Sequence, residues 1–122
     1  MNPSLRFLFV LVSLQLWAAV AMSQEQFLKH FTVDQGLPSN EVYRIDQDDA
    51  GYLWVMTDRG IVRYDGYGFD EMIVSGAPAV YPWFGASHDA SGKMYFFGLK
   101  GHLAVYEKGR LYAHPFNNKI SA

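Results

Sequence analysis

The chain contains an internal repeat, and this repeat restricts its fold more than any other feature. Residues of the same type recur with the same spacing about 41 positions later. The matched pairs are Gly51 and Gly92, Trp54 and Tyr95, and Gly60 and Gly101. Upstream, Gly36-Leu37-Pro38 corresponds to Gly76-Ala77-Pro78 with an offset of about 40 positions. Such a repeat indicates one supersecondary unit built twice, with neighbouring units burying each other's apolar faces.

Each repeat reads as a series of short β-strands. Segments rich in aromatic and β-branched residues alternate with glycine-containing turns, which is typical of antiparallel hairpins. The expected strands are residues 27–33, 42–47, 52–57, 61–64, 69–74, 83–88, 93–98, 103–106 and 111–116. Four short strands per repeat are typical of a β-propeller blade, so we expect an all-β fold with about two blades of an incomplete β-propeller. A small β-sandwich is an alternative use of the same strands.

The first residues have the pattern of a secretory signal peptide. Arg6 precedes an apolar run over residues 7–20, and small residues follow at Ala21 and Ser23. This order of a basic start, an apolar run and a small-x-small end predicts cleavage after Ala21 or after Ser23. A retained signal anchor is the alternative, but the run is shorter than the roughly 20 residues of a spanning helix. We therefore expect export to the periplasm or to the extracytoplasmic face of the inner membrane.

These features predict the following domain organisation. A signal-peptide helix occupies residues 1–23, and the partial propeller occupies residues 24–122. Within the propeller, residues 24–41 form a lead-in strand and loop, residues 42–74 the first blade, and residues 75–122 a diverged second blade. In a closed ring, the lead-in strand would complete the last blade.

Composition and spacing exclude several kinds of chemistry. A net charge of −2 gives no basic face for nucleic acid. The absence of cysteine excludes disulfides and thiolate zinc sites, and the four histidines lack the spacing of metal ligands. Asp46, Asp48 and Asp49 resemble the start of a calcium loop, but the required glutamate is missing, so we interpret them as turn residues. Ser39 does not lie in a nucleophile elbow. We expect no metal, no cofactor and no catalytic residue.

Four residues are candidates for ligand binding. Tyr43 and Arg44 lie on the first strand of one repeat, and Tyr81 and Trp83 lie at the start of the next. In a propeller these positions face the top surface or the central channel, where exposed aromatic rings can stack on sugars. Ordinary packing between blades is the alternative role.

The first repeat resembles the two-component regulator propeller repeat. The resemblance rests on these structural motif residues: Gly36, Leu37, Pro38, Asn40, Gly51, Leu53, Trp54, Thr57, Gly60, Tyr64 and Gly66. It is close over residues 31–73, whereas residues 83–116 keep the glycines and aromatics but lack the Leu-Trp-x-x-Thr core. Proteins of this family are extracytoplasmic sensor regions of bacterial hybrid histidine kinases that act in phosphorelays. The resemblance implies further propeller blades and a carbohydrate ligand as partners, and a membrane contact only through downstream segments.

We therefore expect a ligand-sensing or structural propeller segment of a two-component signal transduction sensor. A propeller needs at least about four blades, so the chain is expected to be a truncated fragment without activity of its own. Two alternatives belong to other classes. One is a fragment of a secreted propeller enzyme, a lyase or glycosidase, which would require a pair of acid and base groups. The other is a fragment of a protein-interaction scaffold.

Overall fold

The computed structural model describes residues 1–21 and 28–120. Contacts divide the chain into two units, Met1–His30 and Phe31–Ala122. The first unit contains helix α1, Pro3–Ala21, whose apolar sequence has no internal glycine or proline and which begins at a proline, a residue favoured at the first helical position. Helix α1 covers most of the predicted signal peptide, and the expected cleavage position after Ser23 lies outside the described residues. In the described part of the chain, no helix is both long and apolar enough to cross a membrane.

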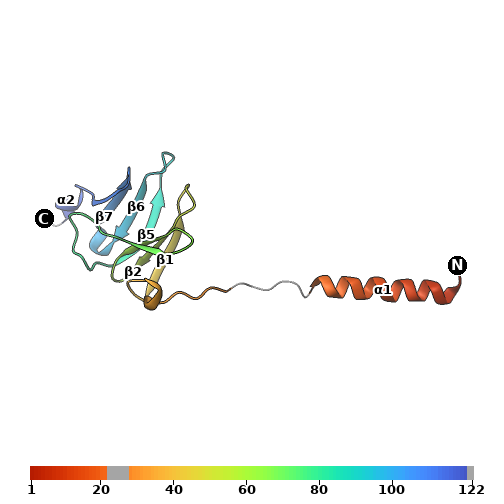
Figure 1. Cartoon of the computed structure of the whole chain (residues 1–122). Coiled ribbons are helices and arrows are strands. Elements are labelled where there is room, and N and C mark those ends of the chain that lie inside the picture. Colours follow the sequence, from red (N-terminus) through yellow and green to blue (C-terminus); the bar gives the residue numbers. More distant parts are fainter. Residues whose placement is uncertain (22–27, 121–122) are drawn as a thin grey trace. The chain divides into compact units, whose positions relative to one another are not determined.

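The second unit consists of two antiparallel four-stranded sheets, which confirms the expected all-β fold (Figure 1). The first sheet contains β1 (Val42–Gln47), β2 (Leu53–Thr57), β3 (Ile61–Tyr64) and β4 (Phe69–Met72). The second sheet contains β5 (Trp83–His88), β6 (Met94–Gly98), β7 (Leu103–Glu107) and β8 (Arg110–Ala113). Strand order follows the chain in both sheets, as in consecutive propeller blades. The short helices are η1 (Val33–Gln35), η2 (Leu99–Gly101) and α2 (Asn117–Ile120).

The two sheets have the same register. Ile45 lies opposite Val55 in the first sheet, just as Ala86 lies opposite Phe96 in the second. Both sheets also carry a β-bulge near the start of the first strand, between Val42 and Arg44 and between Trp83 and Gly85. The sequence repeat is therefore a repeat of strand pairing and of which face each side chain occupies.

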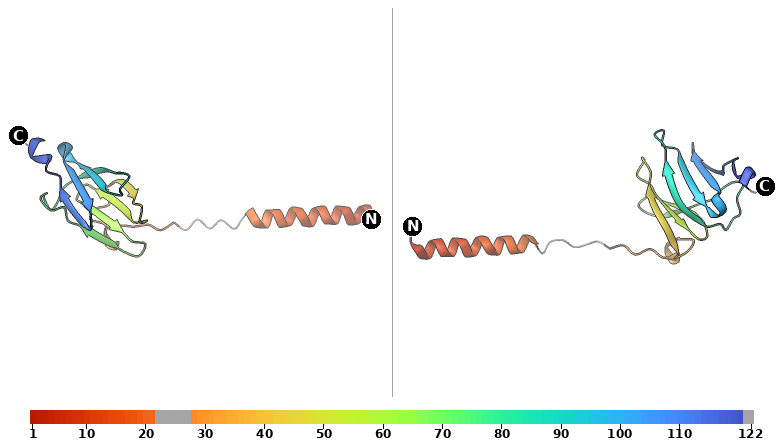
Figure 2. Two further views of the ribbon diagram at one scale, coloured as in Figure 1. Left: turned by 90° about the horizontal axis from the view of Figure 1, so that it is seen from above. Right: turned by 180° about the vertical axis from the view of Figure 1, so that it is seen from behind.

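Trp54 fills the space between the two sheets, which lie side by side with β5 against β1 and β2 (Figure 2). Its side chain is 0% exposed. The Trp54 ring centroid lies 5.2 Å from that of Phe96 and 4.7 Å from that of Tyr106, both in the second sheet. Arg63 adds a polar link across the same interface, because its Nη1 donates to the Tyr106 hydroxyl over 3.2 Å. Aromatic packing therefore holds one sheet on the other.

An aspartate orders the first hairpin of each sheet. The Asp48 carboxylate accepts the backbone N–H groups of Ala50 and Tyr52 at 3.0 Å, and it also accepts the Trp54 indole N–H at 2.8 Å. Asp89 repeats this arrangement, because it accepts backbone N–H groups of its own turn and the Tyr95 hydroxyl at 3.3 Å. These contacts connect the turn to the aromatic residue that packs beside the sheet.

Other motif residues also stabilise turns. The Thr57 hydroxyl donates to the Gly60 carbonyl over 2.9 Å and accepts the Gly60 N–H over 3.0 Å. The Tyr64 hydroxyl donates to the Gly66 carbonyl over 2.7 Å. The motif thus fixes the β2–β3 and β3–β4 connections, which set the register of the sheet.

The expected lead-in strand over residues 27–33 is wrong. Phe27 lies outside the described residues, residues 28–32 have no regular structure, and Val33 begins η1. The cause is a local competition for backbone groups: Thr32 and Gln35 form a capping box, and the Asn40 Oδ1 accepts the Val33 N–H at 3.1 Å. In the repeat, this segment corresponds to an outermost strand, and the described residues contain no third sheet with which it could pair.

Leu37 follows this segment and covers the outer face of the first sheet. It is buried against Val55 and Val62, with Phe31 and Phe69 beside them. Gly36, at a φ of 105°, turns the chain to place Leu37 there, and Gly76 at 86° does the same before Ala77. Ala77 packs at the edge of the core between the sheets, so Leu37 and Ala77 have equivalent positions.

Replacing the central aromatic residue tests this core. We expect Trp54→Ala to lower the free energy of unfolding by about 3–5 kcal/mol, because a large buried side chain is lost and the two sheets cannot collapse onto the cavity. Tyr67→Ala is the matched control, since Tyr67 is 94% exposed on a turn and its removal should have almost no effect. Denaturant unfolding of both variants measures the difference, and equal stabilities would contradict the assigned core.

Candidate functional site

The four candidate residues lie at one end of the two sheets, where β1 and β5 begin. Backbone hydrogen bonds gather the loops at this end. The Asp58 N–H donates to the Glu41 carbonyl and the Tyr81 N–H to the Arg59 carbonyl, both over 3.4 Å. The second bond connects the β4–β5 loop to the β2–β3 turn. The loops of both sheets therefore form one continuous rim.

Tyr43 pairs with Phe84 across the two sheets. Their ring centroids are 4.9 Å apart, and both rings are exposed. Each residue occupies the bulge position of its strand, so the same backbone irregularity aims both side chains. The Tyr43 hydroxyl donates to the Glu41 carboxylate over 2.9 Å, and this hydrogen bond raises the pKa of Tyr43 above its usual value.

Arg44 lies next to this aromatic pair. Its guanidinium forms an ion pair with Asp46 at 3.3 Å and its side chain is more than half exposed. Its Cδ approaches to 3.8 Å of the position that a Cβ on Gly85 would take, so the arginine stem passes close to β5. The site thus carries a solvated cation beside two exposed rings.

Tyr81 and Trp83 form a separate group in the second sheet. Trp83 is only 2% exposed and belongs to the core, so the packing role fits it and its ring offers no surface to a ligand. Tyr81 is half-buried, stacks on the His102 ring at 5.6 Å, and donates its hydroxyl to the Leu99 carbonyl over 2.6 Å. A Cβ on Gly98 would lie 2.8 Å from the Tyr81 ring, so only glycine permits this packing.

The structure therefore brings Tyr43 and Arg44 to one exposed patch and places Tyr81 and Trp83 in the packing beneath the neighbouring loop. Sequence reasoning missed Phe84 and Glu41 at this patch. The repeat contained the signal for Phe84, which follows Tyr43 by about 41 positions and so shares its place in the blade. Glu41 carried no signal, because its role depends on the hydroxyl of Tyr43.

The patch offers aromatic faces and charged groups rather than a metal site. Among residues 1–21 and 28–120, no three histidine, cysteine, aspartate or glutamate side chains gather to hold a metal ion. The two carboxylates of the patch already accept hydrogen bonds from Tyr43 and Arg44. The arrangement is suited to stacking a flat, polar ligand with hydroxyl groups.

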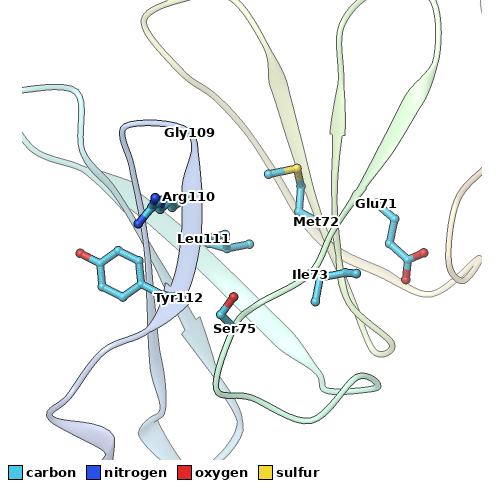
Figure 3. A pocket seen from close by; sticks show the side chains of 8 residues that line it. All are labelled: Glu71, Met72, Ile73, Ser75, Gly109, Arg110, Leu111 and Tyr112. Atoms are coloured by element: carbon cyan, nitrogen blue, oxygen red, sulfur yellow. The ribbon is translucent and has the colours of Figure 1, made fainter.

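A groove of about 660 Å³ lies between the outer strands β4 and β8 (Figure 3). Met72 and Leu111 point toward each other across it, whereas Glu71 and Arg110 point away from it. Its polar groups do not converge on one point, as they do in most ligand sites. We therefore place the candidate site at the Tyr43–Phe84 patch.

In the comparison with known proteins, one family model matches part of the chain. The family model described as two component regulator propeller matches residues 36–59, from the Gly36 turn through β1 and β2 to the following turn. Tyr43 and Arg44 fall within the matched segment, whereas Phe84 lies in the second sheet. None of the curated proteins compared with the chain matches it.

The hydrogen bond between Tyr43 and Glu41 can be tested by titration. A carboxylate acceptor stabilises the neutral phenol, so Glu41→Gln should lower the pKa of Tyr43 toward its ordinary value. Nuclear magnetic resonance of labelled tyrosine rings measures this pKa. Glu71→Gln, on the outer strand β4, is the control and should leave it unchanged. An unchanged pKa in Glu41→Gln would show that the two side chains do not interact.

Proposed function

We propose that this chain, whose residues 36–59 are a two component regulator propeller repeat, belongs to the extracytoplasmic ligand-sensing region of a two-component signal transduction protein. The observation that supports this proposal most directly is the exposed Tyr43–Phe84 pair, which joins the matched repeat to the next blade. In this proposal the partners of the two sheets are further propeller blades of the sensor.

The ligand class that fits the patch is a carbohydrate. Two exposed rings with centroids 4.9 Å apart offer faces for the C–H surface of a sugar ring. The guanidinium of Arg44 and the carboxylate of Glu41 lie on the same rim and can bond to hydroxyl groups. Apolar faces with a few charged neighbours are the usual composition of a site for a small polar ligand.

Sensing requires that the ligand favour one arrangement of the protein over another. Tyr43 belongs to the first sheet and Phe84 to the second. A ligand that contacts both rings therefore binds more tightly when the two blades hold these rings together. Such differential affinity can shift an equilibrium that is coupled to a distant module.

We also propose that the chain is exported. Residues 1–23 would direct the chain out of the cytoplasm, and the propeller would then lie in the periplasm or on the extracytoplasmic face of the inner membrane. The site itself would bind and not catalyse, and a phosphorelay would begin in kinase modules that act from other parts of the signalling protein.

Titration of the full chain with a panel of neutral oligosaccharides tests the ligand class. We expect saturable binding of at least one oligosaccharide, with a loss of tenfold or more in affinity for Tyr43→Ala, because one of the two stacking faces is removed. Tyr67→Ala removes an even more exposed tyrosine from a turn and should bind as the parent chain does. Equal affinities of the two variants, or no binding by the parent chain, would contradict the proposal.

A further inference from the structure

The groove between β4 and β8 is bordered by the outer edges of two sheets. β4 and β8 are the last strands of their sheets, so each has one edge that pairs with no other strand of the described residues. Further propeller blades would stack on the faces of the sheets, and the groove would therefore stay open on the outer side. An open strand edge beside a groove is a surface on which extended peptides dock.

The edge of β8 already accepts an added segment at one point. Ser75, in the β4–β5 connection, lies beside Tyr112 in an isolated parallel bridge. Its N–H donates to the Leu111 carbonyl over 3.1 Å, and its carbonyl accepts the Ala113 N–H over 2.8 Å. The N–H and carbonyl of one strand residue point to the same edge, so the Leu111 N–H also lies on this edge. Because the bridge is isolated, the connection does not extend the pairing to this N–H.

The floor of the groove is apolar. Met72 and Leu111 point toward each other across it (Figure 3). Leu111 is buried and Met72 is half-buried, whereas Ile73 is 76% exposed on the wall of the groove. A volume of about 660 Å³ has room for several residues of an extended segment, and such a segment would cover the exposed side chain of Ile73.

The β8 side of the groove is basic. Lys108 in the β7–β8 turn and Arg110 at the start of β8 are both exposed. Among the residues that the structure describes, neither takes part in an ion pair. Glu107, the acid between the two strands, is already bound, because it pairs with Lys93 at 3.3 Å and accepts the Tyr112 hydroxyl at 3.2 Å. The charge on this side of the groove therefore favours an acidic partner.

We propose that an extended segment of a partner protein, with alternating apolar and acidic residues, docks along the β8 edge. One of its backbone carbonyls accepts the Leu111 N–H, as that of a further strand would. Side chains of an extended segment alternate between two faces, so an apolar side chain lies over Met72 and Leu111 and its acidic neighbour lies beside Arg110. Glu71, on the β4 side, points away from the groove. This inference goes beyond ligand sensing and does not depend on it.

A display library of random heptapeptides, selected on the full chain, tests the proposal. We expect the enriched sequences to alternate apolar and acidic residues, and a synthetic peptide of the enriched sequence to bind the full chain. Arg110→Glu should weaken this binding at least about tenfold, because a repelling charge replaces the attracting one. Lys119→Glu makes the same change of charge on α2, away from the groove, and should bind as the parent chain does.

Pairing with the strand edge has its own readout. Single N-methyl groups would be placed along the backbone of the synthetic peptide, one position at a time. In a peptide strand paired with β8, every second backbone N–H faces the partner strand. We therefore expect methylation to abolish binding at alternate positions and to be tolerated between them.

Each other outcome overturns the proposal. No enrichment would show that the groove takes no extended peptide. Equal affinities of Arg110→Glu and Lys119→Glu, or a loss of binding in Tyr43→Ala alone, would place the peptide elsewhere on the molecule. Equal tolerance of N-methyl groups at all positions would exclude strand pairing. A parent chain that is already dimeric, and that Arg110→Glu makes monomeric, would show that a second copy occupies this edge.

Discussion

The burial of Trp54 between the two sheets is the interaction on which the rest of the structure depends. Each four-stranded sheet is only one layer thick, and the larger of the two buried clusters lies between the sheets. Trp54 is, with Trp83, one of the two largest buried side chains of this core, and it contacts Phe96 and Tyr106 of the other sheet. Its indole N–H would be left without an acceptor in this core, and the Asp48 carboxylate provides one at 2.8 Å.

This packing also positions the candidate site. When the two sheets associate, β1 lies against β5, and the bulges of both strands bring Tyr43 and Phe84 to 4.9 Å. The distance between the two exposed rings therefore depends on the relative position of the blades. A ligand that stacks on both rings would stabilise the same interface as Trp54. Tyr43 lies within residues 36–59, which match the family model of the two component regulator propeller, whereas Phe84 lies in the second sheet.

Eight of the nine expected strands were predictable from local chemistry, because glycine turns and β-branched or aromatic segments specify hairpins without reference to the rest of the fold. The structure of residues 27–33 could not be predicted in this way, since a strand forms only where another strand offers hydrogen bonds. The capping box at Thr32 starts a short helix at Val33 in place of the end of the expected strand. At the site, position in the repeat identified Tyr43 and Arg44. It could not show that Trp83 is buried, because an aromatic residue suits a core as well as a surface.

A double-mutant cycle between Trp54 and Phe96 tests the central claim most directly, since the two residues belong to different sheets and their contact exists only if the sheets pack face to face. Each would be replaced by leucine, singly and together, and unfolding free energies would be measured. We expect a coupling energy of about 0.5–1.5 kcal/mol, the usual range for an aromatic pair. Effects that add within about 0.3 kcal/mol would contradict the packing described for this core.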